Sequence, residues 1–201
     1  MYDYLIYDFD GTISDTYPVF AKALIELLNR HDIKGDYKTA YNQLKVSVGY
    51  ALKQYDISDE TRKEYKEIHR ELAIAEQCAF PEAEEILKFA KDNGKKNYIY
   101  THTGSLVHKL LEKMKLTGYF EFVLDGSYGF LRKPAPDALN YLIEKCGIDR
   151  SRAIMIGDRD IDAEAAKNAG IAGCLIDSEG YYPDCVTDHY IKSLSELKKI
   201  I

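Results

Sequence analysis

The sequence has 201 residues, of which 46% are hydrophobic and 30% charged, and a formal net charge of -6. This composition predicts a globular protein with one good core and room for a smaller second module. The acidic balance argues against a nucleic-acid binder, which needs a basic face to neutralise phosphates. No apolar run approaches the roughly 18 residues of a membrane-spanning helix, and the acidic N-terminal segment is unlike a signal peptide. We therefore expect no nucleic-acid or membrane partner and a cytoplasmic location.

The chain begins with a predicted strand and continues into a long helical segment. Residues 3–8 (DYLIYD) form an apolar run that predicts a buried strand. Residues 15–80 contain no convincing strand. They offer a charged stretch at 59–77, which we predict to be a solvated helix, and one helical face made of Phe20, Ala23, Leu24, Leu27 and Leu28. We predict a helical domain at 15–80, inserted into a core made of residues 1–14 and 81–201.

Strands and helices alternate after residue 80. Further apolar runs at 97–101, 120–124, 153–156 and 172–176 predict buried strands. Helices are predicted over 105–115 and 136–147, and the second has Pro136 near its start and Gly147 near its end. This alternation is typical of an α/β fold. We predict a Rossmann-like parallel sheet core flanked by helices, with the helical domain inserted after the first strand.

Polar side chains follow four of the predicted strands. Asp8 and Asp10 come after the first strand and Thr101 ends the second. Lys133 lies in the loop after the third strand, and Asp158 follows the fourth. In a parallel sheet, ligands gather outside the carboxyl ends of the strands, so we expect these groups to meet at one site. Converging carboxylates with a hydroxyl and a cation are suited to a phosphate and a hard metal ion, which favours Mg²⁺.

These groups can carry out phosphoryl transfer. The Asp8 carboxylate can attack phosphorus to form an aspartyl-phosphate, which splits one difficult displacement into two easier steps. Asp10 is expected to protonate the leaving oxygen in the first step and to activate water in the second. The Thr101 hydroxyl and the Lys133 ammonium are expected to hold the phosphate oxygens. Mg²⁺ would offset the charge on the transferring phosphoryl group.

Four segments, in this order, resemble the motifs of the haloacid dehalogenase-like hydrolases, which are mostly phosphatases: DFDGT (8–12), NYIYT (97–101), RKPAPD (132–137) and GDRDID (157–162). The resemblance implies Asp8 as nucleophile and Asp10 as general acid and base. It also implies Mg²⁺ held by Asp8, the Asp10 main-chain carbonyl and Asp158. Asp162 matches the second acid of the fourth motif, which implies that it acts through water or by orienting its neighbours.

The segment DGTISDTYPVFAKAL (10–24) is similar to the opening of the phosphoglycolate phosphatase-like subgroup, in which the helical insertion is a cap. The resemblance therefore implies a Mg²⁺-dependent phosphatase, a phosphoric monoester hydrolase, that acts on a small phosphate ester such as phosphoglycolate. Two alternatives share the same core. One is a β-phosphoglucomutase-like phosphoryl transferase, although such mutases carry a His where Phe20 stands. The other is an inorganic pyrophosphatase.

Two further positions have open roles. His102 follows Thr101 where the family often has Asn, and we expect it either to bind phosphate or to pack against the cap. The turn at Ser47 and Gly49 resembles the substrate-specificity loop of such caps, but it is equally an ordinary turn between helices. The sequence does not indicate an oligomeric state.

Overall fold

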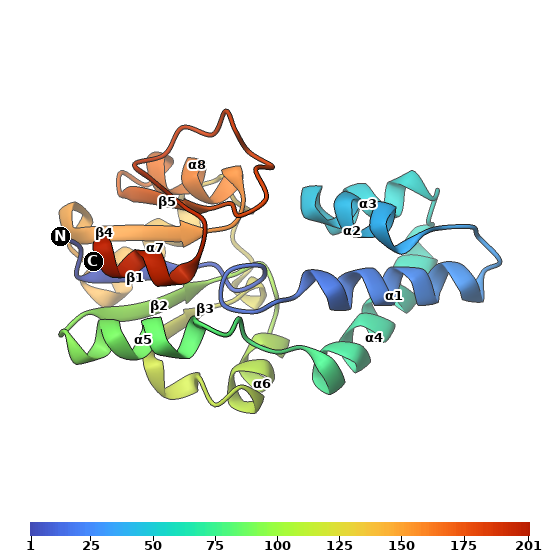
Figure 1. The fold of residues 1–201 in the computed structure, drawn as a ribbon, viewed down its shortest axis with the longest axis horizontal. Coiled ribbons are helices and arrows are strands. Elements are labelled where there is room, and N and C mark those ends of the chain that lie inside the picture. Colours follow the sequence, from blue (N-terminus) through green and yellow to red (C-terminus); the bar gives the residue numbers. More distant parts are fainter. The chain divides into compact units, whose positions relative to one another are not determined.

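The computed structural model describes residues 1–201, and the chain divides into two compact units. The first, here called the α/β unit, comprises Met1–Ser14 and Ala79–Ile201, and the second, the helical unit, comprises Asp15–Cys78. Figure 1 shows the elements of both units. None of the helices has both the length and the apolar character needed to cross a bilayer.

The α/β unit is built on one six-stranded sheet in the order β3-β2-β1-β4-β5-β6, in which all neighbouring strands are parallel. The strands are β1 (Tyr4–Tyr7), β2 (Lys96–Tyr100), β3 (Phe120–Leu124), β4 (Ala153–Gly157), β5 (Ala172–Ile176) and β6 (His189–Ile191). The predicted Rossmann-like α/β fold and its five predicted strands are confirmed. The sixth strand, β6, was not predicted because its three residues form too short an apolar run at the edge of the sheet.

Helices cover both faces of the sheet. They are α5 (Ala83–Asp92), α6 (Leu106–Lys113), α7 (Asp137–Cys146) and α8 (Asp160–Asn168), together with the 3-10 helices η1 (Thr117–Tyr119), η2 (Gly126–Tyr128), η3 (Arg150–Arg152) and η4 (Leu194–Lys199). Successive strand residues point to opposite faces, and Leu5 and Ile6 of β1 are both fully buried. Ile6 packs in a core cluster with residues of α7 and α8, whereas α5 contacts β2 and η4.

The strand β3 differs from the expectation of a buried strand. It lies at the edge of the sheet, where it pairs only with β2. Glu121 is exposed, and Leu124 is the one residue of β3 that is fully buried. An edge strand with an outward charge resists pairing with another chain, which is a common way of protecting a sheet edge.

The helical unit consists of α1 (Tyr17–Arg30), α2 (Tyr37–Val46), α3 (Val48–Gln54) and α4 (Asp59–Glu76). Three of these helices begin at a side chain that caps the first turn. The side-chain oxygens of Asp36, Ser47 and Ser58 accept hydrogen bonds from the third following amide at 3.0, 2.9 and 3.2 Å, respectively. Such caps satisfy amides that have no partner within the helix. Ser47 therefore has a structural role at the start of α3.

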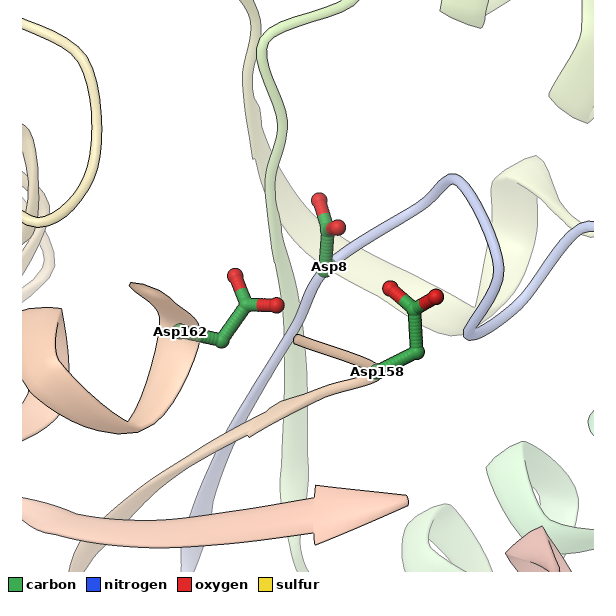
Figure 2. Close-up of side chains that lie close together, drawn as sticks. All are labelled: Asp8, Asp158 and Asp162. Atoms are coloured by element: carbon green, nitrogen blue, oxygen red, sulfur yellow. The ribbon is translucent and has the colours of Figure 1, made fainter. Parts of the chain in front are cut away.

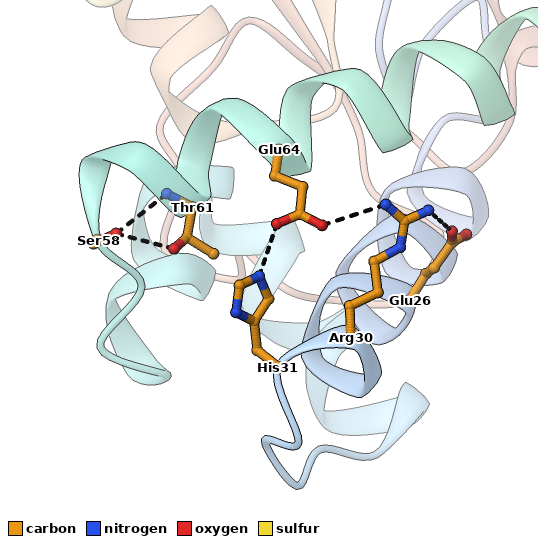
Figure 3. A network of polar contacts seen from close by, with 6 residues as sticks. All are labelled: Glu26, Arg30, His31, Ser58, Thr61 and Glu64. Carbon is orange, nitrogen blue, oxygen red and sulfur yellow. Dashed lines mark hydrogen bonds and ion pairs between the residues drawn. The ribbon is translucent and has the colours of Figure 1, made fainter.

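The helix α4 is less solvated than its charge suggests. Its residues Tyr65, Ile68 and Ala73 are buried, and the first two pack in the core cluster of the helical unit. The exposed side of α4 carries charged residues that reach the end of α1, as Figure 3 shows: Glu64 pairs with Arg30 at 3.3 Å and with His31 at 2.7 Å. Exposed pairs of this kind contribute little stability individually, so the apolar face is what holds α4 in place.

Candidate active site

Three aspartates meet at the carboxyl ends of the central strands. Asp8 follows β1, Asp158 follows β4, and Asp162 lies in the first turn of α8. Strand order reverses beside β1 and β4, which is the place where open parallel sheets bind ligands. The three side chains are only 4%, 7% and 1% exposed. Figure 2 shows them around a common space, and each offers a carboxylate oxygen within 4.8 Å of the others.

Lys133 is buried between two of these aspartates. It comes from the loop between β3 and α7, and its Nζ lies 2.9 Å from Asp8 Oδ1 and 2.8 Å from Asp162 Oδ1. The ammonium also donates to the Tyr100 carbonyl at the end of β2, at 3.0 Å. Burial acts to lower the pKa of Lys133, but Asp162 and Asp8 outweigh it and raise the pKa above its ordinary value. Lys133 is therefore a permanent cation in the site.

The site carries more negative than positive charge. Burial raises the pKa of Asp8, and the positive charge of Lys133 lowers it. The neighbouring acids Asp162, Asp10 and Asp158 raise it further. One ammonium does not balance three buried carboxylates, and buried charge without compensation is costly. A hard divalent cation with oxygen ligands would remove the imbalance. The donors available here are hard oxygens, which fit Mg²⁺ better than a softer metal.

Asp10 is connected to the segment after β2. It lies at the start of a turn in which Gly11 has a φ of 77°, a left-handed conformation that favours glycine. The Thr103 hydroxyl donates to Asp10 Oδ2 at 2.6 Å. Thr101, which is 1% exposed, accepts a hydrogen bond from the Thr103 amide at 3.0 Å. Thr103 thus joins two of the candidate residues. It was not among our sequence candidates because it lies beyond the matched segment NYIYT, which ends at Thr101.

His102 has a partner that the sequence did not indicate. Its Nε2 accepts a hydrogen bond from the Lys133 backbone amide at 2.9 Å. Burial lowers the pKa of His102 to about 3, and the charges of Lys133, Arg132 and Arg159 act in the same direction. The imidazole is therefore neutral near pH 7. Phosphate binding by His102 stays a prediction.

Glycine is required at two close approaches around the site. At Gly157, the residue before Asp158, an added Cβ would overlap the carboxyl group of Asp162. At Gly126, in the loop after β3, an added Cβ would overlap the main-chain carbonyl of His102. Both glycines allow neighbouring segments of the candidate site to lie in direct contact, a use of glycine that the sequence motifs alone did not specify.

The structure thus brings the sequence candidates together to different extents. Asp8, Asp158, Asp162 and Lys133 form one buried group. Asp10 and Thr101 are joined to each other through Thr103. His102 reaches the group through the backbone of Lys133.

Residues 5–176, which include all of these side chains, match the family model described as haloacid dehalogenase-like hydrolase. A phosphoglycolate phosphatase from Vibrio parahaemolyticus is 30% identical over 221 aligned positions, which cover 98% of this chain and 95% of that protein. A phosphoglycolate phosphatase from Aquifex aeolicus is 28% identical, with 85% and 83% covered. The solved structure of a hydrolase from Streptococcus pneumoniae TIGR4 is 29% identical, with a TM-score of 0.72 and 99% and 97% covered.

These matches agree with the α/β architecture described above. The relatives bear out the enzyme class predicted from the sequence, a phosphoric monoester hydrolase. The chain belongs to the haloacid dehalogenase-like hydrolases.

Proposed function

We propose that the chain is a Mg²⁺-dependent phosphatase that hydrolyses a small phosphate monoester through an aspartyl-phosphate on Asp8. The observation that carries this proposal is the buried contact of 2.9 Å between Asp8 and Lys133, set among two further buried aspartates at the carboxyl ends of β1 and β4. A nucleophile of this kind needs a cation beside it that can also hold the phosphate oxygens. Lys133 has the position and the charge to do both.

In the proposed first step, a carboxylate oxygen of Asp8 forms a bond to phosphorus while the bond from phosphorus to the ester oxygen breaks. Asp10 gives its proton to the departing alcohol oxygen. In the second step, Asp10 removes a proton from water, the water oxygen attacks phosphorus, and the bond to Asp8 breaks to release phosphate. Lys133 and the hydroxyl of Thr101 hold the phosphate oxygens throughout. The hydrogen bond from Thr103 would keep the Asp10 carboxyl oriented between the two steps.

We propose that Asp8, Asp158 and the main-chain carbonyl of Asp10 hold the metal ion. Both Asp162 oxygens are engaged, since Oδ1 contacts Lys133 at 2.8 Å and Oδ2 accepts from the Arg159 amide at 3.2 Å. This supports a role for Asp162 in orienting Lys133. When bound, Mg²⁺ would supply positive charge against the phosphoryl oxygens and bring the Asp8 carboxyl into its ionised form.

The part of the substrate that leaves as an alcohol determines which phosphate ester is hydrolysed. The names of the curated relatives make phosphoglycolate the first candidate. On the sequence resemblance, we also propose that the helical unit is a cap and that Ser47 and Gly49, which lie at the start of α3 rather than in a free turn, influence which ester is accepted. A mutase-like transferase and a pyrophosphatase remain the alternatives, and Phe20 in α1 argues against the mutase because a histidine is expected there.

The central test is hydrolysis of p-nitrophenyl phosphate with and without Mg²⁺. Asp8→Asn should remove nearly all turnover, since an amide keeps the shape but cannot act as the nucleophile. The matched control is Asp160→Asn, a neighbouring acid outside the proposed set, which should retain most of the activity. An Asp8→Asn variant with more than about a tenth of the wild-type rate would contradict covalent catalysis. Full activity in EDTA would contradict the metal assignment.

A substrate panel separates the phosphatase from the alternatives. Phosphoglycolate, hexose phosphates and pyrophosphate should be compared at equal concentration with Mg²⁺ present. With β-glucose 1-phosphate and catalytic glucose 1,6-bisphosphate, we expect release of free phosphate and little glucose 6-phosphate. Efficient isomerisation without phosphate release would favour the transferase, and a clear preference for pyrophosphate would favour the pyrophosphatase.

A further inference from the structure

We propose that His102 is a positioning residue whose imidazole ring holds the backbone of Lys133 and thereby places the lysine ammonium against Asp8. This inference rests on the proposed function, because it assigns a role within the same site. It differs from phosphate binding by His102, in which the ring itself would contact the substrate.

The contact fixes which ring nitrogen carries the proton. The Lys133 amide lies 2.9 Å from His102 Nε2. A backbone amide can only donate, so Nε2 is the unprotonated acceptor and the ring proton is on Nδ1. The groups around the ring maintain this state, because burial and the positive charges of Lys133, Arg132 and Arg159 oppose a second proton and outweigh Asp162, which favours it. Nε2 is then already occupied and is not available to donate to an anion.

Lys133 is held at both of its ends by neighbouring residues of one segment. His102 accepts from its backbone amide, and the Tyr100 carbonyl accepts from its ammonium at 3.0 Å. The Tyr100 ring adds a further contact, with the ammonium 4.5 Å from the ring centroid. The same ring lies edge-on to the His102 ring, at 5.9 Å between centroids. The residues at the end of β2 therefore contact both the backbone and the ammonium of Lys133.

His102 is itself fixed by the loop that leads to Lys133. The Gly126 amide donates to the Thr103 carbonyl at 2.9 Å, and the close approach of Gly126 to His102 leaves no room for a side chain there. Further along the loop, the Asn168 amide group donates to the Pro134 carbonyl at 2.9 Å. These contacts hold the backbone at both ends of the hydrogen bond, and the ring itself contacts the Lys133 amide and the Tyr100 ring. Without the ring, the Lys133 amide would lose this hydrogen bond and the backbone from which the lysine reaches Asp8 would be held less tightly.

The first test reads the contact without using activity. Nitrogen NMR of the full chain, with labelled histidine, should show His102 as a neutral ring protonated on Nδ1 at every pH from 8 to 5. The Lys133 amide resonance should shift strongly in His102→Ala and return toward its wild-type position in His102→Gln, whose side-chain oxygen can accept the same hydrogen bond. A His102 ring that takes up a proton near the ordinary value of about 6.5 would overturn the inference. An unchanged Lys133 amide in His102→Ala would also overturn it.

The second test asks whether His102 acts through Lys133. For p-nitrophenyl phosphate with Mg²⁺, His102→Ala should lower kcat by about 10- to 100-fold, the loss expected for a misplaced catalytic group. His102→Gln should recover most of it. In a Lys133→Met background, His102→Ala should add less than about a twofold loss, since the two changes remove the same interaction. Equal losses in both backgrounds would refute a role through Lys133.

The two tests also separate this inference from the proposed function. A wild-type chain without phosphatase activity would refute the function, whereas the NMR result would still establish or exclude the contact between His102 and Lys133. If the Lys133→Met enzyme is too slow to measure, the NMR experiment decides.

Discussion

Replacing His102 with glutamine should make the chain less sensitive to acid. The pKa of His102 is lowered to about 3 by burial and by the nearby cations, against about 6.5 in an unfolded chain. Between pH 3 and pH 6.5, His102 is therefore protonated in the unfolded state and neutral in the folded state. The contribution of the neutral His102 ring to the free energy of unfolding is therefore fully present above pH 6.5 and is lost as the pH falls toward 3.

The size of this effect follows from the pKa difference. Each pKa unit corresponds to about 1.36 kcal/mol, and pH 5.0 lies about 1.5 units below the unfolded value. The wild-type chain should thus lose about 2 kcal/mol of unfolding free energy between pH 7.5 and pH 5.0 on account of His102. Glutamine does not titrate, so the variant should lack this loss. Groups such as Asp8 titrate in both proteins and cancel in the comparison.

Urea unfolding in metal-free buffer measures the difference directly. The stability of wild type minus that of His102→Gln should fall by about 2 kcal/mol from pH 7.5 to pH 5.0. His102→Leu is the matched control. The stability of wild type minus that of His102→Leu should show the same change with pH, and the Leu variant should also be less stable by a constant amount of about 1 kcal/mol, since leucine cannot accept the hydrogen bond. If neither difference depends on pH, the inference that the folded chain keeps the His102 ring neutral is wrong.

Three further predictions concern other parts of the chain. Gly157→Ala should destabilise the α/β unit by about 1–3 kcal/mol in urea unfolding, because its Cβ would overlap the buried carboxyl at the start of α8; Gly118→Ala, with no atom within 4 Å of an added Cβ, should change little. Thr103→Val should cost about 1.5 kcal/mol of transition-state stabilisation, roughly tenfold in kcat, by releasing Asp10, and an unchanged rate would refute this. Gly49 is exposed, and a Cβ added there would lie 3.9 Å from the Ser47 hydroxyl, so Gly49→Val should fit without a clash and should alter the ranking of natural esters more than the rate on an aryl phosphate. Equal losses on all substrates, or none, would exclude a role in selection.

The sheet was largely predictable because buried parallel strands form continuous apolar runs. All five such runs became strands of one sheet. The order of the strands was not predictable, since apolar runs do not indicate which run pairs with which. The edge position of β3 follows from this order, whereas β6 was missed because its three residues form too short an apolar run. The burial of Tyr65 and Ile68 in α4 was missed because the charged residues between them hide the apolar face.

At the site, the sequence indicated which residue types gather but not how they contact one another. The motifs predicted Asp8, Lys133 and Asp158 because acids and a cation that follow successive predicted strands in this order point together to one site, although each residue alone has ordinary structural uses. The contact of His102 with a backbone amide depends on loop geometry far along the chain, which no local pattern encodes. The same holds for Thr103, whose partner Asp10 lies 93 residues earlier in the chain.

The central place of β1 has a consequence for how the chain folds during synthesis. Leu5 of β1 pairs on one side with Asn97 and on the other with Ile154. Both partner strands are therefore synthesised long after β1. The helical unit, in contrast, is one continuous segment, and even its contact between α1 and α4 joins residues that are much closer in the chain than β1 and β2 or β1 and β4. Because distant pairings are slow to form and local ones are fast, we expect the helical unit to become compact on the ribosome while β1 is still unpaired. An apolar strand would then stay exposed until β4 emerges, which makes this interval the period of greatest risk of aggregation and the one in which a chaperone would be most useful.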